Sequence, residues 1–161
     1  MKKAFLLLFV IVLSTKLTKA QTDWKSYKVD DKISIKLPID PERKDEKNLS
    51  VVTKDSSAYF ITIIDMGADT AKASEIINKP DFAEGLKNAM MEKNPGFTVG
   101  EMKRGSWKNY PIFHAEGANT LSHLKVYFYM LSIGSRLYLM GDIVPDNKSI
   151  DTNFSDLLSL N

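Results

Sequence analysis

Alternating apolar and polar residues predict β-strands along most of the chain after its first twenty residues. In the run from Ile33 to Leu37, Ile33, Ile35 and Leu37 point to one side and the polar residues to the other. Pro38 ends this run, because proline donates no hydrogen bond to a ladder. The same reasoning predicts strands at Trp24–Val29, Ile33–Leu37, Leu49–Thr53, Ala58–Asp65, Phe97–Trp107, Tyr110–Ala118, Leu121–Ile133 and Arg136–Val144.

Two of these strands are apolar on both faces, around Tyr59–Ile64 and Leu124–Leu131. Such strands are typical of the centre of a sheet that is covered on each side. The connections after residue 97 are short, with turns expected at Lys108-Asn109, around Asn119 and at Gly134-Ser135. Short connections between successive strands predict an antiparallel meander.

Helical spacing occurs at two places. After a loop over Met66–Ala73, we expect a helix that begins near Asn78–Asp81, and a second helix from about Ser149 to the end. The apolar face of the first holds Phe82, Leu86, Ala89, Met90 and Lys93, and that of the second Ile150, Phe154, Leu157 and Leu158. The fold class predicted is α+β, a mostly antiparallel sheet with helices on opposite faces, as in an α/β/α sandwich.

The first twenty residues have the layout of a cleavable signal peptide. A basic start at Lys2-Lys3 precedes the ten apolar residues Ala4–Leu13, and Thr18-Lys19-Ala20 places small residues at a cleavage site. Ten helical residues rise about 15 Å, which is about half of a bilayer core. We therefore predict a signal peptide over residues 1–20, cleaved after Ala20, and one domain over residues 21–161 of a secreted or periplasmic protein.

The net charge of the predicted mature chain differs in sign from that of the whole sequence. The sequence holds 22 basic and 20 acidic residues, a net +2. The leader carries four lysines and no acidic residue, so residues 21–161 hold 18 basic against 20 acidic residues, a net −2. A nucleic-acid partner therefore has no support from charge. The absence of cysteine from the sequence excludes disulfides and thiolate metal sites.

The order of elements resembles a known superfamily. The strand Ile33–Leu37 followed by Pro38, the hairpin from Leu131 to Tyr138 and the ending Phe154–Leu160 resemble the PsbP/Mog-like α/β/α sandwiches. This superfamily includes an extrinsic photosystem II protein, a Ran-binding import factor and DcrB-type bacterial envelope proteins. The resemblance implies that fold and a non-enzymatic role in an exported bacterial protein. It carries over no functional residue.

The candidate chemistry centres on the chain's two histidines, His114 and His123. If the turn between their strands centred on Ala118-Asn119, the two imidazoles would face each other across the hairpin. Glu116 would add a carboxylate, and the three side chains would form a plausible site for zinc. A slip of one residue would place the rings on opposite faces, and an exposed polar pair without a ligand is the competing interpretation.

No motif for a nucleotide site or a serine hydrolase occurs in the sequence. We therefore expect an exported, non-catalytic binding or accessory protein of the bacterial cell envelope, without a cofactor and with another envelope protein as its partner. The alternative is a protein that binds a divalent metal, Zn, through His114, His123 and Glu116.

Overall fold

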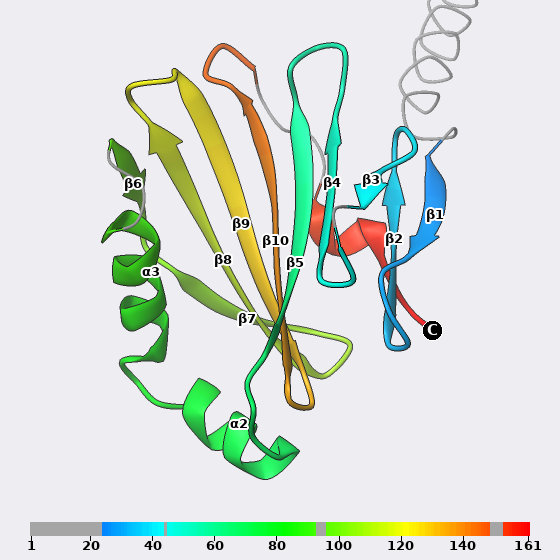
Figure 1. Cartoon of the computed structure of the whole chain (residues 1–161). Helices are drawn as coiled ribbons and strands as arrows, with labels where there is room; N and C mark the ends of the chain where they lie inside the picture. The colour runs from blue at the N-terminus through cyan, green and yellow to red at the C-terminus, as the bar shows by residue number, and fades with distance from the viewer. Residues whose placement is uncertain (1–23, 44, 93–95, 149–152) are drawn as a thin grey trace, which may run out of the picture.

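The structure is a computed structural model, which describes residues 24–43, 45–92, 96–148 and 153–161. The predicted signal peptide and its cleavage site at Ala20 lie outside the described residues. Two antiparallel sheets and two α-helices make up the described part, which confirms the α+β class (Figure 1). Within these ranges, neither α-helix combines the length and the apolar content that crossing a bilayer requires.

The larger sheet has eight strands. Its order is β3-β4-β5-β10-β9-β8-β6, and β7 also pairs with β8. The strands are β3 (Glu42–Arg43), β4 (Asn48–Val52), β5 (Ala58–Asp65), β6 (Phe97–Val99), β7 (Lys103–Trp107), β8 (Tyr110–Asn119), β9 (Leu124–Ile133) and β10 (Arg136–Pro145). The meander predicted after residue 97 is confirmed. β5 and β9 lie inside the sheet, as their apolar runs indicated, with β10 between them.

Both predicted helical regions differ from expectation. The first is two helices, α2 (Thr70–Ile77) and α3 (Phe82–Glu92), so the loop predicted through Ala73 ends at Asp69. The Asp69 carboxylate accepts a hydrogen bond from the Lys72 amide at 2.8 Å and caps α2, a cap that the sequence interpretation missed. The predicted C-terminal helix is wrong over its described part, where a 3-10 turn, η2 (Phe154–Leu157), leads into a strand, β11 (Leu158–Leu160).

This C-terminal strand belongs to the smaller sheet, whose order is β1-β2-β11. Here β1 (Lys25–Lys28) and β2 (Ile33–Leu37) form the hairpin expected from their alternation, and β11 pairs Leu158 with Ile35. The segment forms a strand because the edge of β2 is free to pair with it, and this pairing satisfies the backbone donors and acceptors of both strands.

The two faces of the large sheet are covered by different elements (Figure 1). On one face, α2 and α3 pack through Ile77, Phe82 and Leu86 against Phe113 and Met130. The other face packs against the small sheet and η2. Its core includes the fully buried residues Ile33, Ile35, Leu37, Ile61, Leu131, Tyr138, Met140 and Phe154. The prediction of helices on opposite faces is therefore wrong for the described α-helices, which both lie on one face.

Asp30, in the turn between β1 and β2, ties the two sheets together. Its carboxylate accepts hydrogen bonds from the Tyr138 hydroxyl at 2.7 Å and the Arg136 guanidinium at 3.0 Å, both on β10. It also accepts from the amides of Lys32 and Ile33. Burial raises the pKa of this carboxyl, but the Tyr138 bond and the other donors outweigh it and lower the pKa below its ordinary value.

Candidate functional site

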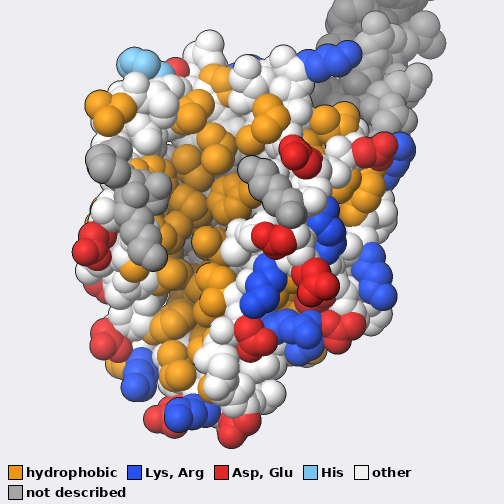
Figure 2. Space-filling view, viewed as in Figure 1, with side chains coloured by type: hydrophobic (Ala, Val, Ile, Leu, Met, Phe, Trp, Pro, Cys, Tyr) orange, Lys and Arg blue, Asp and Glu red, His pale blue; other side chains and the backbone are white. Residues whose placement is uncertain are grey.

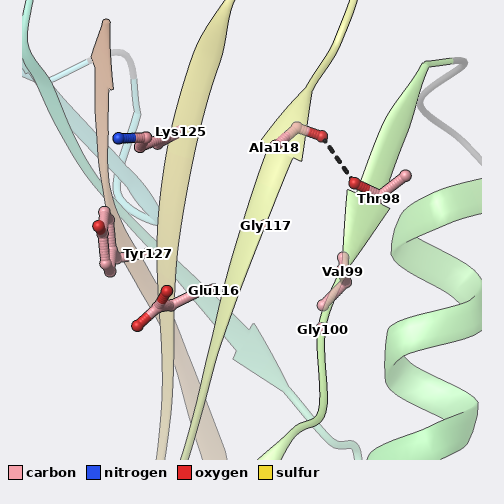
Figure 3. A pocket seen from close by; sticks show the side chains of 8 residues that line it. All are labelled: Thr98, Val99, Gly100, Glu116, Gly117, Ala118, Lys125 and Tyr127. Atoms are coloured by element: carbon pink, nitrogen blue, oxygen red, sulfur yellow. Dashed lines mark hydrogen bonds between the residues drawn. The ribbon is translucent and has the colours of Figure 1, made fainter. Parts of the chain in front are cut away.

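A shallow hollow, open to solvent, lies on the large sheet where β6, β8 and β9 end (Figure 3). It encloses about 400 Å³. Its lining is Thr98, Val99, Gly100, Glu116, Gly117, Ala118, Lys125 and Tyr127. The side chains of Glu116, Lys125 and Tyr127 leave the sheet on one side in Figure 3. They lie on the face that packs against the small sheet elsewhere. Among the described residues, no helix or strand covers this end of that face, which we call its uncovered end.

The floor of the hollow depends on Gly117. A Cβ atom there would lie 2.7 Å from the Thr98 carbonyl oxygen and 3.0 Å from the Phe97 ring. Glycine therefore lets β6 approach β8 closely, and the Thr98 hydroxyl donates a hydrogen bond to the Ala118 carbonyl at 3.3 Å (Figure 3). The Gly100 amide then bonds the Glu116 carbonyl at 2.8 Å, and β6 ends there. The strand predicted over Phe97–Trp107 is thus two strands, β6 and β7.

Four side chains that carry oxygen atoms form one row across the sheet at this level. Glu116 on β8 pairs with Tyr127 on β9, Tyr127 pairs with Asp142 on β10, and Asp142 pairs with Tyr59 on β5. Directly paired residues of an antiparallel sheet share a face, with Cβ atoms about 4.5–5.5 Å apart. We call these four residues, Glu116, Tyr127, Asp142 and Tyr59, the acidic tyrosine row.

Asp142 is the unusual member of this row, because it is 1% exposed and its carboxyl oxygens have no hydrogen-bond partner among the described residues. Buried carboxyl groups normally have partners, and one without them calls for an explanation. Burial raises the pKa of Asp142 to about 7. A strongly perturbed group beside a hollow is a candidate functional residue.

The tyrosines around Asp142 share its environment. Burial, followed by the charge of Asp142, raises the pKa of Tyr59 to about 12. Burial also raises the pKa of Tyr127, with a further contribution from Glu116. Trp24 packs edge-on against Tyr59 with ring centroids 5.5 Å apart. The row therefore combines two carboxyl groups with aromatic rings in a partly dehydrated setting.

The structure separates the two histidines that the sequence analysis paired. The β8–β9 hairpin turns over residues 120–123, so Ala118 and Asn119 belong to β8, and His114 pairs with Tyr129 instead of His123. The turn is centred three residues later than predicted, which moves the register by six positions. The predicted cross-strand histidine pair is therefore wrong.

The three proposed metal ligands occupy two places. His123 lies in the turn, with Nδ1 3.4 Å from the Asp146 carboxylate, and the side chain is mostly exposed. His114 stacks near Tyr129, with ring centroids 6.3 Å apart, and shares a shallow hollow of about 320 Å³ with Glu116. Among the described residues, no group of three or more His, Cys, Asp or Glu side chains is placed to hold a metal ion.

Asp142 was not singled out by the sequence analysis, although the sequence contains a signal for it. In β10, Tyr138, Met140, Asp142 and Val144 share one face, and all four are buried. A charged residue at one position of an otherwise buried face indicates either a partner or a function. The residues beside Asp142 on β5 and β9 could not be identified from the sequence, because this requires the pairing register of the strands.

Comparisons with known proteins add little to this description. No family model and no curated protein matches the chain. Among solved structures, the chain is similar to PA94 of Pseudomonas aeruginosa, a protein of unknown function. The identity is 12%, the match covers 76% of this chain and 83% of that chain, and the TM-score is 0.47. A similarity at this level says nothing about function.

Proposed function

We propose that this chain is an exported, non-catalytic binding protein of the bacterial cell envelope, and that it contacts another envelope protein through the uncovered end of its large sheet. The observation that carries the binding role is the hollow beside the acidic tyrosine row. It is shallow, and it presents a carboxylate, an ammonium group and a phenol on one open surface. Enclosed, mostly apolar pockets are typical of small-molecule sites, whereas a surface of this kind suits a segment of another protein.

The proposal of export rests on the leader described above, with its basic start, short apolar run and small residues before Gln21. Membership of the PsbP/Mog-like superfamily is part of the same proposal. Its support is the strand Ile33–Leu37 with Pro38 after it and the β9–β10 hairpin that turns at Gly134-Ser135.

Photo-crosslinking in living cells tests the binding role directly. A photoreactive amino acid replaces Glu116 in one variant and Lys72, an exposed residue on α2 at the opposite face, in a control variant. We expect a discrete crosslinked product from position 116 and none from position 72. Equal products from both positions, or none from either, would remove the support for a binding surface at the hollow.

Export is tested separately, by fractionating the cells and determining the N-terminus of the accumulated protein. We expect the chain to begin at Gln21 and to leave the cytoplasm. A chain that keeps Met1 and stays in the cytoplasm would contradict this part of the proposal without affecting the crosslinking result.

A divalent-metal function is the second candidate, with two of the three predicted ligands, His114 and Glu116, on one surface. His114 and Glu116 are both exposed on the same face of β8 and line one shallow hollow. Two protein ligands leave the remaining positions of a zinc ion to water or to a partner.

A further inference from the structure

The acidic tyrosine row carries acceptor groups that lack donors. Within the described ranges, the carboxyl groups of Glu116 and Asp142 and the hydroxyls of Tyr59 and Tyr127 make no hydrogen bond or ion pair with the protein. These four side chains are consecutive neighbours on one face. Of the four, Asp142 is buried and Glu116 is exposed to solvent. Leaving a buried carboxyl without a partner is unfavourable, so Asp142 indicates a donor that comes from outside the chain, and Glu116 adds a second carboxylate at the surface.

We infer that the acidic tyrosine row binds a cationic side chain, the guanidinium of arginine or the ammonium of lysine, which a partner protein inserts at the hollow. This inference rests on the proposed binding function and names the chemistry of the contact. Such groups only donate hydrogen bonds, carry the charge that two carboxylates attract, and stack favourably on aromatic rings. The row offers a carboxylate at the entrance, Glu116, and a carboxyl in the interior, Asp142, with a tyrosine beside each.

The chain's own nearby cations are bound elsewhere. The Lys125 ammonium lies 3.5 Å from the carbonyl oxygen of Lys148. The Lys148 ammonium is paired with the Asp55 carboxylate at 2.9 Å and also bonds the Asp55 carbonyl. Neither lysine bonds a member of the row among the described residues. An inserted cation therefore meets acceptors that no cation of the described residues already occupies.

Tyr127 forms the boundary between the hollow and Asp142. Its ring lines the hollow, and its residue pairs with Glu116 on one side and Asp142 on the other. The ring is only partly buried, and a cation that reaches the Asp142 carboxyl from the hollow requires this ring to rotate about its side-chain bonds. The entering group takes the space that the ring leaves and stacks against it.

Proton exchange gives this binding a distinctive signature. The titratable groups next to Asp142 are Tyr59 on β5 and Tyr127 and Tyr129 on β9. Further away lie Asp55 beside Tyr59, Glu116 and Lys125 at the hollow, and His114 beside Tyr129. None of the described groups supplies a positive charge to Asp142, whose pKa is raised by burial alone. A bound cation favours the ionised carboxylate, so binding below the pKa of Asp142 releases a proton.

The test is a titration of the folded protein with N-acetylarginine amide, with N-acetylcitrulline amide as its uncharged counterpart of nearly the same shape. Binding is followed by NMR shifts of the Tyr127 and Gly117 amides. We expect the arginine compound to bind about tenfold more tightly than the citrulline compound, because a charge-assisted bond is stronger than a neutral one. Calorimetry in two buffers of different ionisation enthalpy should show proton release at about pH 6 and none at about pH 8.5.

Two variants assign the effect to the row. Asp142→Asn should abolish proton release and lower the affinity for the arginine compound about tenfold, and Glu116→Gln should lower the affinity but leave proton release in place. Asp81→Asn, at an exposed acidic residue before α3, is the matched control and should change neither. If Asp142→Asn fails to fold, the affinity of Glu116→Gln for the arginine compound still tests whether the cation contacts the Glu116 carboxylate. Equal affinity for the arginine and citrulline compounds overturns the inference, while a crosslink from position 116 would leave the proposed binding function standing.

Discussion

Asp142 on β10 pairs directly with Tyr127 on β9, which brings a buried carboxyl next to an open hollow. The pairing places the least exposed acidic residue of the described chain one side chain away from solvent. Most of the buried face around it is apolar, and Ile61, Leu131 and Met140 fill the next positions. The fold therefore maintains a carboxyl in a place where burial alone works against its charged form.

Replacing Asp142 with asparagine should stabilise the protein at neutral and alkaline pH. The pKa of Asp142 is about 7 in the folded chain and near 3.8 when unfolded, so the folded state binds the extra proton between these values. The contribution of Asp142 to the free energy of unfolding is therefore most favourable below about pH 4 and is lost as the pH rises through about 7. At about pH 8 we expect a gain of about 2–4 kcal/mol in the free energy of unfolding of the variant.

Urea denaturation across this pH range measures that difference. The wild-type free energy of unfolding should decrease between about pH 4 and 7 relative to that of Asp142→Asn. Asp81→Asn, at an exposed aspartate before α3, is the control and should leave the profile unchanged. A variant that is less stable than wild type at about pH 8 would show that Asp142 has a partner when ionised.

Adding a side chain at Gly117 should separate β6 from β8. The new Cβ would meet the Thr98 carbonyl oxygen at 2.7 Å, so the backbone of one strand must move. For Gly117→Ala we expect a loss of about 1–3 kcal/mol in stability and a disturbed hollow. Gly105→Ala is the control, because its nearest atom would lie 3.5 Å away, at ordinary contact distance. Thermal unfolding distinguishes the two, and equal melting temperatures would contradict the close approach.

Removing the Asp30 carboxylate should loosen the small sheet from the large one. Asp30→Ala leaves the Tyr138 hydroxyl and the Arg136 guanidinium without the acceptor that both share. We expect a loss of about 2–4 kcal/mol, against about 1 kcal/mol for Tyr138→Phe, which removes one bond. Because the folded pKa of Asp30 is lowered, its contribution is present above about pH 4 and is lost as the pH falls below that. An Asp30→Ala variant of wild-type stability would exclude this contact as a link between the sheets.

Zinc binding should not require both histidines. His114 pairs with Tyr129, which follows His123 by six residues in the chain. The two imidazoles therefore do not share one ion. In a zinc titration we expect His123→Ala to match wild type. His114→Ala or Glu116→Gln should remove any binding at the β8 surface, which is held by two ligands. Tight zinc binding that is lost in His123→Ala would contradict this prediction, because it would mean that both imidazoles bind the same zinc ion in solution.

Several elements were predictable because they depend on local pattern. The alternation in Ile33–Leu37, the doubly apolar runs of β5 and β9, and the turn at Gly134-Ser135 each appear in the structure where the sequence indicated. The helix face that begins at Phe82 does so as well, with Phe82 and Leu86 packed on the sheet. Periodicity reports which side of an element is buried, and that information is contained in a short window of residues.

The candidate site depended on relationships that no short window contains. The β8–β9 turn is centred three residues later than predicted, so Glu116 pairs with Tyr127 and the two histidines are separated. The C-terminal segment has helical spacing, but its end pairs with β2, more than one hundred residues earlier. Local propensity is a weak preference that such an edge overrides.

The sequence by itself determined the strand-forming segments, the mildly acidic balance after the leader and the lack of disulfides, because these follow from composition and from the spacing of neighbouring residues. Only the tertiary structure decided which residues meet: it buried Asp142 between Tyr59 and Tyr127, opened a hollow beside them and anchored Asp30 on β10. The physical reason is that strand pairing and desolvation depend on the whole arrangement of strands, and a single residue in one loop changes every contact beyond it.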